Sequence, residues 1–438
     1  MTELGAPTGA AGDTLPPAGT AAGEYILLGI PDSHGQIRGK AMRPVAFEAA
    51  VRDGAMTTDL LLGLDPTDTP ITDYEDFGIK TGAGDVVVEP ETDTLRELSW
   101  LPGWRVCLGT PLRWTDGTPC HFSTREVLRR VLEALSYDAL AAIEYEVRLR
   151  DGDGRPLSSG ISYSLGEIAR FETFMERLKP ALDALEVELG AIHTEAGPGL
   201  LELNVAARPA LRAADDAIYL KLAVKEVAAS LGLEASFLAK TRPGEEGSSG
   251  HVHLSCWQNE ANVFSGDGGT LESAIAGILD HLAAASLLLN PTINSYKRLV
   301  PGWFAPINAS WGEENRSCAV RAIRGPGSDR CRLECRRPGA DANPYLAIAA
   351  LAAAAGDGIR RGASPPEPVV GDAYARDDLP PLPASLESAI AAFEADPVLR
   401  EALGETFSDY YLVSRRWELK AWQDAVSDWE RERYSRAV

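Results

Sequence analysis

Four short segments of the chain alternate acidic or imidazole side chains with apolar ones, the spacing of β-strands that line a polar site. The segments are residues 141–149, 193–202, 250–255 and 332–336. In an extended strand residues i and i+2 face the same side, so Glu144 and Glu146 would share one face. Buried carboxylates without partners are costly, and a sheet face that carries several holds cations or arginines. The pattern therefore predicts an α+β fold in which one sheet face carries a cation-binding site.

Composition narrows the class of protein. With 438 residues the chain is too long for one ordinary domain, and its 45% hydrophobic residues suffice for a large core. The formal net charge of −22 leaves no basic surplus to neutralise phosphates, which argues against a nucleic-acid-binding protein. The six cysteines form no Cys-x-x-Cys pair, which favours reduced thiols and a cytoplasmic location.

Local composition predicts the domain organisation. Residues 1–23 are rich in Ala, Gly, Pro and Thr and lack an apolar stretch, so we expect a disordered tail and no signal peptide. The Pro-, Gly- and Trp-rich stretch 98–114 predicts a boundary, with a small mixed domain at 24–108 and a large α+β domain at 109–438. The Ala-rich helix expected around 343–356 is too short to span a bilayer, so we expect no membrane association.

Hydrophobic periodicity places the main elements. Strands are expected at residues 25–30 and 85–89, with a short helix at 45–51 between them. Ser123-Thr-Arg-Glu126 has the pattern of a capping box that opens a helix. Further helices are expected at residues 170–185, 213–231 and 271–289. A Pro-rich linker is expected at residues 362–383, followed by helices that run to the end of the chain.

Two of the segments carry candidate metal ligands. Glu195 and Glu202 flank Gly197-Pro-Gly199, a bend that can bring both carboxylates to one point. His251-Val-His253 fits a metal ligand beside a phosphate contact, although such a pair is a weak signal alone. Each acidic pair alone also fits a solvent-facing edge strand or a polar hairpin. Mostly carboxylate ligands with one imidazole suit Mg²⁺ or Mn²⁺ better than zinc.

Arginines crowd one region of the C-terminal half: Arg298, Arg316, Arg321, Arg332 and Arg336. Forked guanidinium groups suit phosphate and carboxylate oxygens. Surface salt bridging is the ordinary alternative, but it explains poorly why Glu334 stands between two arginines in an apolar strand. No Gly-x-Gly-x-x-Gly loop, Walker motif or Gly-x-Ser-x-Gly elbow is present, so any nucleotide would be held by metals and arginines.

From Glu24 to the C-terminus the chain resembles the glutamine synthetase family, on motifs that agree in order. They are Asn290–Gly302, Asn315–Ser317, Arg332–Pro338 and Asn343–Leu346. The resemblance implies an N-terminal β-grasp domain followed by a catalytic domain whose antiparallel sheet carries the active site. It also implies a homo-oligomer, a dodecamer of two stacked rings, with active sites between neighbouring subunits.

The resemblance also implies a role for each site residue. One divalent ion would be held by Glu146, Glu195 and Glu202. A second ion would be held by Glu144, His251 and Glu334, within a set of two or three Mg²⁺ or Mn²⁺. ATP or its transferred phosphate would contact His253, Ser255, Arg316, Arg321 and Arg332. Glutamate would be bound by Gly247, Arg298 and Arg336. The γ-carboxylate would attack ATP to give γ-glutamyl phosphate, with Arg316 and Arg321 stabilising the charge, and an amine would then displace phosphate.

The chain departs from the family pattern mainly at the amine end. Phe304, after Trp303, stands where the family has a glutamate that covers the site and helps deprotonate ammonium. Phenylalanine cannot accept a proton, but it can pack on a carbon skeleton. A second family acid falls on Thr58, or on Asp59 after a one-residue slip, while a third is kept as Asp85.

These departures favour a ligase that joins glutamate to an organic amine, with a short alkylamine, ethanolamine or an aromatic amine preferred. A polyamine substrate also stays possible, because Glu313 and Glu314 on the same loop could bind its distal positive charges. Asp85, Asp59 or water would take the amine proton. Leu200 replaces a Gln, and Glu246 replaces an Asn near the expected glutamate amino group, so a different acid substrate also stays open. The remaining alternatives are an ordinary glutamine synthetase and a non-catalytic oligomer of the same fold.

Overall fold

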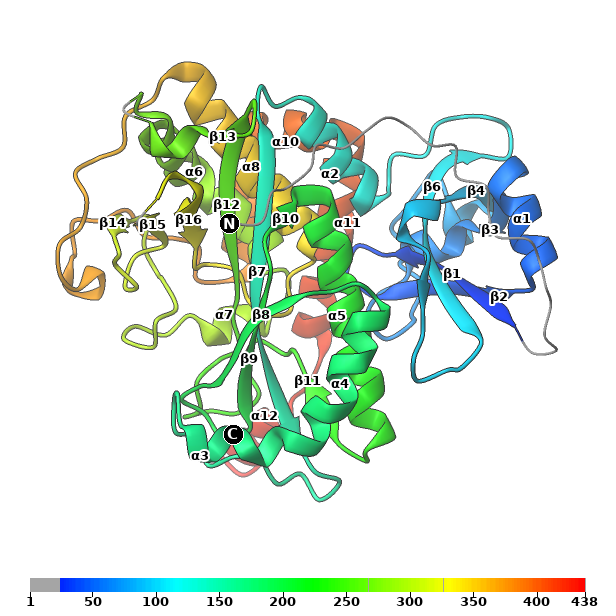
Figure 1. Cartoon of the computed structure of the whole chain (residues 1–438), viewed down its shortest axis with the longest axis horizontal. Coiled ribbons are helices and arrows are strands. Elements are labelled where there is room, and N and C mark those ends of the chain that lie inside the picture. The colour runs from blue at the N-terminus through cyan, green and yellow to red at the C-terminus, as the bar shows by residue number, and fades with distance from the viewer. Residues whose placement is uncertain (1–23, 267, 326, 438) are drawn as a thin grey trace.

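The computed structural model describes residues 24–266, 268–325 and 327–437. The tail expected at residues 1–23 lies outside the described residues. Two sheets organise the chain, a small one from the N-terminal part and a large one from the rest. Figure 1 shows the small sheet in blue and cyan at one side of the larger part, whose strands are mostly cyan, green and yellow.

The small sheet has the strand order β2-β1-β6-β4-β3, with β5 paired to β6. Its strands are β1 Tyr25–Pro31, β2 Ile37–Met42, β3 Ala55–Thr58, β4 Asp85–Pro90, β5 Arg96–Glu97 and β6 Trp104–Trp114. Helix α1, Pro44–Asp53, packs Phe47 and Ala50 against the sheet core. The boundary expected between residues 108 and 109 falls inside β6, which pairs with β1 through its first half and with β4 through its second. The small sheet therefore extends past the expected boundary.

The large sheet has the order β14-β15-β16-β12-β7-β9-β8, and its neighbours along this path are antiparallel except β14 and β15. Its strands are β7 Asp138–Arg150, β8 Leu189–Thr194, β9 Leu200–Val205, β10 Arg208–Pro209, β11 Glu234–Ser236, β12 Gly250–Gln258, β13 Ala261–Asn262, β14 Trp311–Glu313, β15 Val320–Arg324 and β16 Cys331–Cys335. The four segments singled out in the sequence are neighbours in this one sheet.

Strand β7 shows the predicted alternation. Ile143, Tyr145 and Val147 are buried in the core, while Glu144 and Glu146 between them are half-buried and face the opposite side. The strand pairs with β12 on one side and β9 on the other, so the acidic face of β7 lies at the centre of the sheet. The strand prediction is confirmed.

Helices cover the apolar face of the large sheet and the end of the chain. They are α2 Thr124–Glu133, α3 Leu165–Ile168, α4 Glu172–Ala184, α5 Ala210–Ser230, α6 Thr270–Leu289, α7 Ser295–Arg298, α8 Pro344–Arg361, α9 Leu386–Glu394, α10 Pro397–Leu403, α11 Glu405–Asp424 and α12 Asp428–Tyr434. Ser123 caps α2 as predicted, accepting a hydrogen bond from the Glu126 amide. Short 3₁₀ helices include η1, Asp59–Gly63.

Helices α6 and α8 form the densest helix pair, and glycines permit their approach. A Cβ at Gly277 would lie 2.1 Å from the Ala354 carbonyl oxygen, and one at Gly358 would lie 2.0 Å from the Ser273 carbonyl oxygen. Within the described residues α6 alone is long and apolar enough to cross a membrane, judged by length and composition, yet 72% of its most apolar stretch is buried inside the fold. It is thus packed as a core helix.

The small sheet is held against the C-terminal helices. The Tyr410 hydroxyl on α11 donates to the Leu62 carbonyl at 2.6 Å, and Tyr74 donates to the Tyr410 carbonyl at 3.2 Å. Arg415 on the same helix approaches Nδ1 of His34 at 3.1 Å. Burial, reinforced by the charge of Arg415, lowers the pKa of His34 well below its ordinary value, so this buried ring is neutral.

Candidate active site

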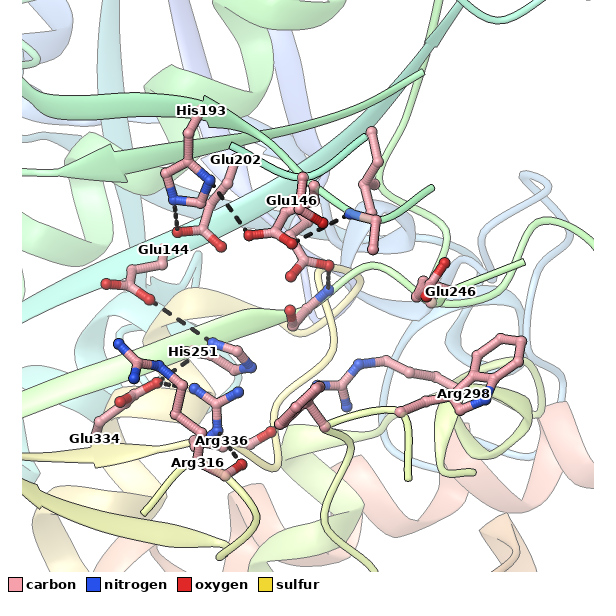
Figure 2. Close-up of a pocket in the computed structure, with 18 of the residues that line it drawn as sticks. Glu144, Glu146, His193, Glu202, Glu246, His251, Arg298, Arg316, Glu334 and Arg336 are labelled. Carbon is pink, nitrogen blue, oxygen red and sulfur yellow. Dashed lines mark hydrogen bonds and ion pairs between the residues drawn. The ribbon is translucent and has the colours of Figure 1, made fainter. Parts of the chain in front are cut away.

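A cavity of about 780 Å³ opens on the acidic face of the large sheet (Figure 2). Most of the predicted site residues line it: Glu144, Glu146, Glu195, Glu202, Gly247, His251, Arg298, Trp303, Phe304, Arg316, Arg321, Glu334 and Arg336. Glu246 and Leu200, the two smaller departures from the family pattern, line it as well. The fold therefore gathers side chains that are up to 192 residues apart in sequence, from Glu144 to Arg336, around one space.

The first acidic cluster is built by the hairpin of β8 and β9. His193 lies opposite Glu202 in the β8–β9 register, and Glu202 lies opposite Glu146 in the β9–β7 register. The His193 ring sits between two carboxylates, with Nε2 2.9 Å from Oε1 of Glu202 and Nδ1 3.3 Å from Oε1 of Glu195. The ligating atoms of these three residues lie within 4.8 Å of one another, as a metal site requires.

Electrostatics show that this cluster has an excess of negative charge. Burial, together with the charge of Glu202, raises the pKa of Glu146 to about 7. Although burial favours the neutral ring, the carboxylates of Glu195 and Glu202 raise the pKa of His193 to about 10. The carboxylates of this cluster therefore favour an added positive charge close to them. Three carboxylates and one imidazole suit Mg²⁺ or Mn²⁺.

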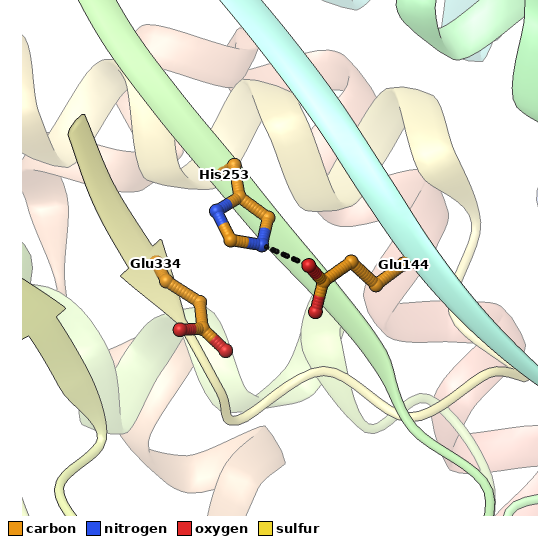
Figure 3. Close-up of side chains that lie close together, drawn as sticks. All are labelled: Glu144, His253 and Glu334. Carbon is orange, nitrogen blue, oxygen red and sulfur yellow. Dashed lines mark ion pairs between the residues drawn. The ribbon is translucent and has the colours of Figure 1, made fainter. Parts of the chain in front are cut away.

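The second cluster joins three strands, β7, β12 and β16. Figure 3 shows Glu144, His253 and Glu334 pointing into one gap, with His253 Nε2 3.0 Å from Oε1 of Glu144. His251, the expected ligand, lies 3.7 Å from Glu144 and 3.5 Å from Glu334 through Nδ1, and its Nε2 is buried without a hydrogen-bond partner in the described structure. Both His251 and His253 therefore lie close to the carboxylates of this cluster, whereas the sequence analysis expected only His251 to bind the metal there.

Both carboxylates of this cluster are held ionised. Although burial raises it, the pKa of Glu144 is lowered strongly by hydrogen bonds with His251 and His253. Arg336 and the two histidines outweigh burial at Glu334 and lower its pKa to about 2. Arg321 adds a contact of 3.0 Å to Glu334. The two carboxylates can therefore accept a cation without first losing a proton.

A second cavity of about 220 Å³ adjoins the first through Glu144 and Asn204, which line both. It is lined by the three remaining residues expected to contact ATP: His253, Ser255 and Arg332. Arg332 donates from Nε to Nδ1 of His253 at 3.1 Å. The Nδ1 atom is then the acceptor, which leaves the proton on Nε2, facing Glu144. The contact orients the ring at the junction of the two cavities.

Arg298 and Gly247 form one end of the main cavity. The buried guanidinium of Arg298 donates to the carbonyl oxygens of Arg336 and Arg337, at 3.2 and 3.1 Å. A Cβ at Gly247 would lie 2.5 Å from Cγ of Arg298 and 2.6 Å from the Ala239 oxygen, so only glycine fits beside it. Arg336 in turn donates from Nε to the Arg316 carbonyl at 3.0 Å. These contacts hold the arginines in fixed positions toward the cavity.

The mouth of the cavity is aromatic. Trp303 and Phe304 lie on a tight turn in which Gly302 and Phe304 have φ values of 80° and 52°. Phe304 is 59% exposed. Tyr163, also with a positive φ of 53°, stacks on His193 with ring centroids 4.1 Å apart. These aromatic side chains and the carboxylate clusters thus line the same cavity.

Three predicted residues lie elsewhere in the chain. Thr58, Asp59 and Asp85 do not line either cavity of the same chain; they gather at the end of β3 and β4, where Thr58 pairs with Asp85. Asp59 is buried and accepts a hydrogen bond from the Gly78 amide at 3.2 Å. Burial and then the charge of Asp85 act to raise its pKa. The expectation that these residues belong to the amine pocket is not met within one copy of the chain.

Several lining residues were not predicted, among them His193, Asn204 and Tyr163. His193 was visible only as a His-x-Glu pair with Glu195, a weak signal alone. Asn204, which donates to Glu202 at 2.8 Å, follows that acid at strand spacing. Tyr163 comes from an irregular loop, and nothing in its local sequence indicates its stacking on His193.

Comparison with known proteins agrees with this geometry. Residues 122–434 match the family model for the glutamine synthetase catalytic domain. A glutamate–isopropylamine ligase from Pseudomonas is 33% identical over 94% of this chain and 95% of its own length. A γ-glutamylethanolamide synthetase from Streptomyces coelicolor is 32% identical over 95% and 96%. The solved structure of apo GmaS without ligand has a TM-score of 0.83 and 27% identity, covering 94% of this chain and 97% of that one.

Proposed function

The chain belongs to the glutamine synthetase family and is an ATP-dependent carbon–nitrogen ligase; we propose that it joins the γ-carboxylate of glutamate to an organic amine. The observation that carries the proposal is the rim of the main cavity. Phosphate- and cation-binding side chains surround its floor, while Trp303 and Phe304 line its mouth in place of an acidic lid. An apolar rim suits an amine that brings a carbon skeleton, and it cannot take a proton from ammonium.

The donor sets fit divalent ions. Glu146, Glu195, Glu202 and His193 would hold one ion, and Glu144, Glu334 and His251 would hold another, in a set of two or three Mg²⁺ or Mn²⁺. When bound, the ions would neutralise charge on the phosphates of ATP. Asn204, between the two cavities, would keep Glu202 oriented through its 2.8 Å hydrogen bond.

The chain's own residues would then position the reactants. Ser255, His253 and Arg332 would hold the nucleotide in the smaller cavity, with Gly247, Arg298 and Arg336 binding glutamate. A γ-carboxylate oxygen attacks the terminal phosphorus and ADP leaves; Arg316 and Arg321 would stabilise the spread negative charge. The amine nitrogen then attacks the acyl carbon, phosphate leaves with the bonding electrons, and the amine gives up a proton to Asp85, Asp59 or water.

A short alkylamine or ethanolamine fits best. Polyamines would need acidic groups to hold their distal charges, and the two acids nearest the aromatic rim in sequence are already engaged. Glu313 pairs with Arg324 at 3.0 Å, and Glu314 pairs with Arg321. The names of two relatives, an isopropylamine ligase and an ethanolamide synthetase, support the same substrate class.

The proposal extends to architecture and location. The small sheet would be a β-grasp domain, and neighbouring copies in a dodecamer would bring the β3–β4 end, with Thr58, Asp59 and Asp85, to the amine side of the cavity. That arrangement would explain why these three residues lie away from the cavity of their own chain. Six free, buried cysteines fit a reducing cytoplasm.

Phosphate release from ATP, measured with glutamate and Mg²⁺ and a panel of amines, tests the function. The panel contains ammonium, methylamine, isopropylamine, ethanolamine, benzylamine and putrescine, and mass spectrometry identifies each amide. We expect turnover with a small organic amine and little with ammonium. Preferential use of ammonium would establish a glutamine synthetase instead. No phosphate release with glutamate, but release with another acid, would show that the acid substrate differs, as Glu246 near the amino-group site allows. No phosphate release with any acid or amine would indicate a non-catalytic oligomer.

A further inference from the structure

Lys240 links two loops that both line the main cavity. Its ammonium nitrogen lies 4.0 Å from the centre of the Trp303 ring. The same ammonium donates to the carbonyl oxygen of Glu245, in the loop that presents Glu246 and Gly247 to the cavity. One side chain therefore touches both the expected glutamate-binding loop and the aromatic rim.

Hydrogen bonds hold the backbone of Lys240 in place, and they therefore fix the point from which its side chain extends. Its amide donates to Oδ1 of Asn294 at 2.8 Å, and Nδ2 of Asn294 donates back to its carbonyl at 2.9 Å. The loop closes at its base, where the Ser248 amide donates to the Ala239 oxygen at 2.9 Å. Arg148, itself buried, donates to the Glu246 oxygen at 2.9 Å and holds the far side.

Trp303 lies on a short turn, where its amide donates to the Val300 carbonyl oxygen at 3.2 Å. It lies between Gly302 and Phe304, both in the left-handed backbone region, at φ 80° and 52°. That conformation is unfavourable for Phe304, and its ring is largely exposed, so the turn depends on contacts made elsewhere. A cation over an indole face is attracted by the ring, and the half-buried position of Lys240 strengthens that attraction.

We propose that Lys240 is a positioning residue that holds Trp303 against the glutamate-binding loop and thereby sets the width of the amine pocket. The inference rests on the proposed function for its substrate, and on the Lys240–Trp303 contact for its geometry. With the clamp in place the indole limits the space beside Phe304 to a small amine. Without it, the turn at 300–304 opens, small amines lose contact area and larger amines gain entry.

Hydrogen exchange tests the clamp without any assumption about catalysis. The variants are Lys240→Met, which keeps length but removes charge, Lys240→Arg, which keeps a cation that stacks on indole, and Lys297→Met, an exposed lysine on the neighbouring α7, as control. We expect amide exchange at residues 302–305 to rise about tenfold in Lys240→Met and to stay near the parent rate in the other two. Unchanged exchange in a folded Lys240→Met protein would overturn the inference.

Kinetics with the amine panel test the effect on the pocket. In Lys240→Met we expect KM for the smallest good amine to rise about five- to tenfold with kcat nearly unchanged, and benzylamine to improve relative to it. Trp303→Leu should give a similar profile, and adding Lys240→Met to it should change little more, because the clamp is already gone. Fully additive effects would show that Lys240 acts only through the Glu245 carbonyl. If no amine is a substrate, the proposed function fails while the exchange result still decides the clamp.

Discussion

At position 304 an aromatic ring projects from a left-handed backbone, with φ 52°, at the mouth of a cavity lined by six glutamates. A carboxylate in the same place would attract a small cation and could accept its proton. Phenylalanine offers only carbon surface. The identity of this one side chain therefore bears directly on the choice between ammonium and a larger amine.

We expect Phe304→Glu to raise kcat/KM for ammonium at least about tenfold and to lower it for alkylamines, because a general base contributes about 10²–10⁴-fold to such steps. Steady-state phosphate release with each nucleophile measures the change. Phe304→Leu, which stays apolar, is the matched control and should keep the parent preference. An unaltered ammonium rate in Phe304→Glu would count against the role given to this position.

His193 should contribute to metal binding. Its ring lies 2.9 and 3.3 Å from two carboxylates of the first cluster, where its neutral form offers a nitrogen ligand. We expect His193→Asn to weaken Mn²⁺ binding about tenfold or more, measured by calorimetry. His121→Asn, at an exposed position, should bind Mn²⁺ like the parent. Equal affinity in both variants would assign His193 to charge balance alone.

At the scale of elements, sequence predicted the large sheet well because burial there follows strand periodicity. Glu144 and Glu146 alternate with buried residues of β7, and one register slip would place carboxylates in the core. The small sheet is harder to predict from the sequence. β6 contains Pro111 and follows a Pro- and Gly-rich stretch, and such a composition predicts a domain boundary instead of a strand. In the structure Pro111 lies opposite Val88, next to an irregularity in β4, where a strand tolerates proline.

Site residues on strands could be predicted from the sequence, whereas site residues on loops were harder to predict. Strand spacing places Glu334 and the histidines of β12 on a common face, but it does not say which imidazole is nearer to which carboxylate. Side-chain rotation and the contact from Arg332 decide that, and both depend on the assembled sheet. The stacking of Tyr163 on His193 depends on a loop with a positive φ, for which no local pattern exists.

The loop between β11 and β12 yields a prediction of its own. Because a Cβ at Gly247 would collide with Arg298 and with the Ala239 oxygen, we expect Gly247→Ala to displace the guanidinium and raise KM for glutamate about tenfold or more. Initial rates at saturating ATP and amine measure this. Gly166→Ala, where the nearest atom would be 3.9 Å from the new Cβ, is the control. A normal KM for glutamate in Gly247→Ala would separate this loop from glutamate binding.

At the scale of the whole molecule, a charged cluster ties three helices together away from the site. His281 on α6 lies 2.7 Å from Asp396, the N-cap of α10, and 3.2 Å from Asp357 on α8. The hydrogen bond with Asp396, opposed by burial and assisted by Asp357, raises the pKa of His281, while His281 helps to lower the pKa of both aspartates. Both ring nitrogens face acids, so the ring is cationic.

This cluster should make stability depend on pH. A raised histidine pKa contributes stability that is complete below about pH 6.5 and is lost as pH rises through the folded pKa; lowered aspartate pKa values contribute stability that is lost below about pH 4. We expect the thermal midpoint to fall between pH 6 and 9 more steeply in the parent than in His281→Gln. Parallel curves for the two proteins would show that the cluster does not titrate in this range.

Because Asp85 lies away from the cavity of its own chain, oligomers that mix two different variants should behave differently from either variant alone. If each active site takes Asp85 from one chain and Glu334 from its neighbour, a chain with Asp85→Asn is impaired alone and a chain with Glu334→Gln is inactive alone. A mixed assembly of the two nevertheless contains some sites in which both residues are intact. Equal co-expression should restore activity at about a quarter of the sites, since each half is intact half of the time. By the same logic one defective copy harms its neighbour as well as itself, so such a mutation would act dominantly in a cell that also makes the normal chain.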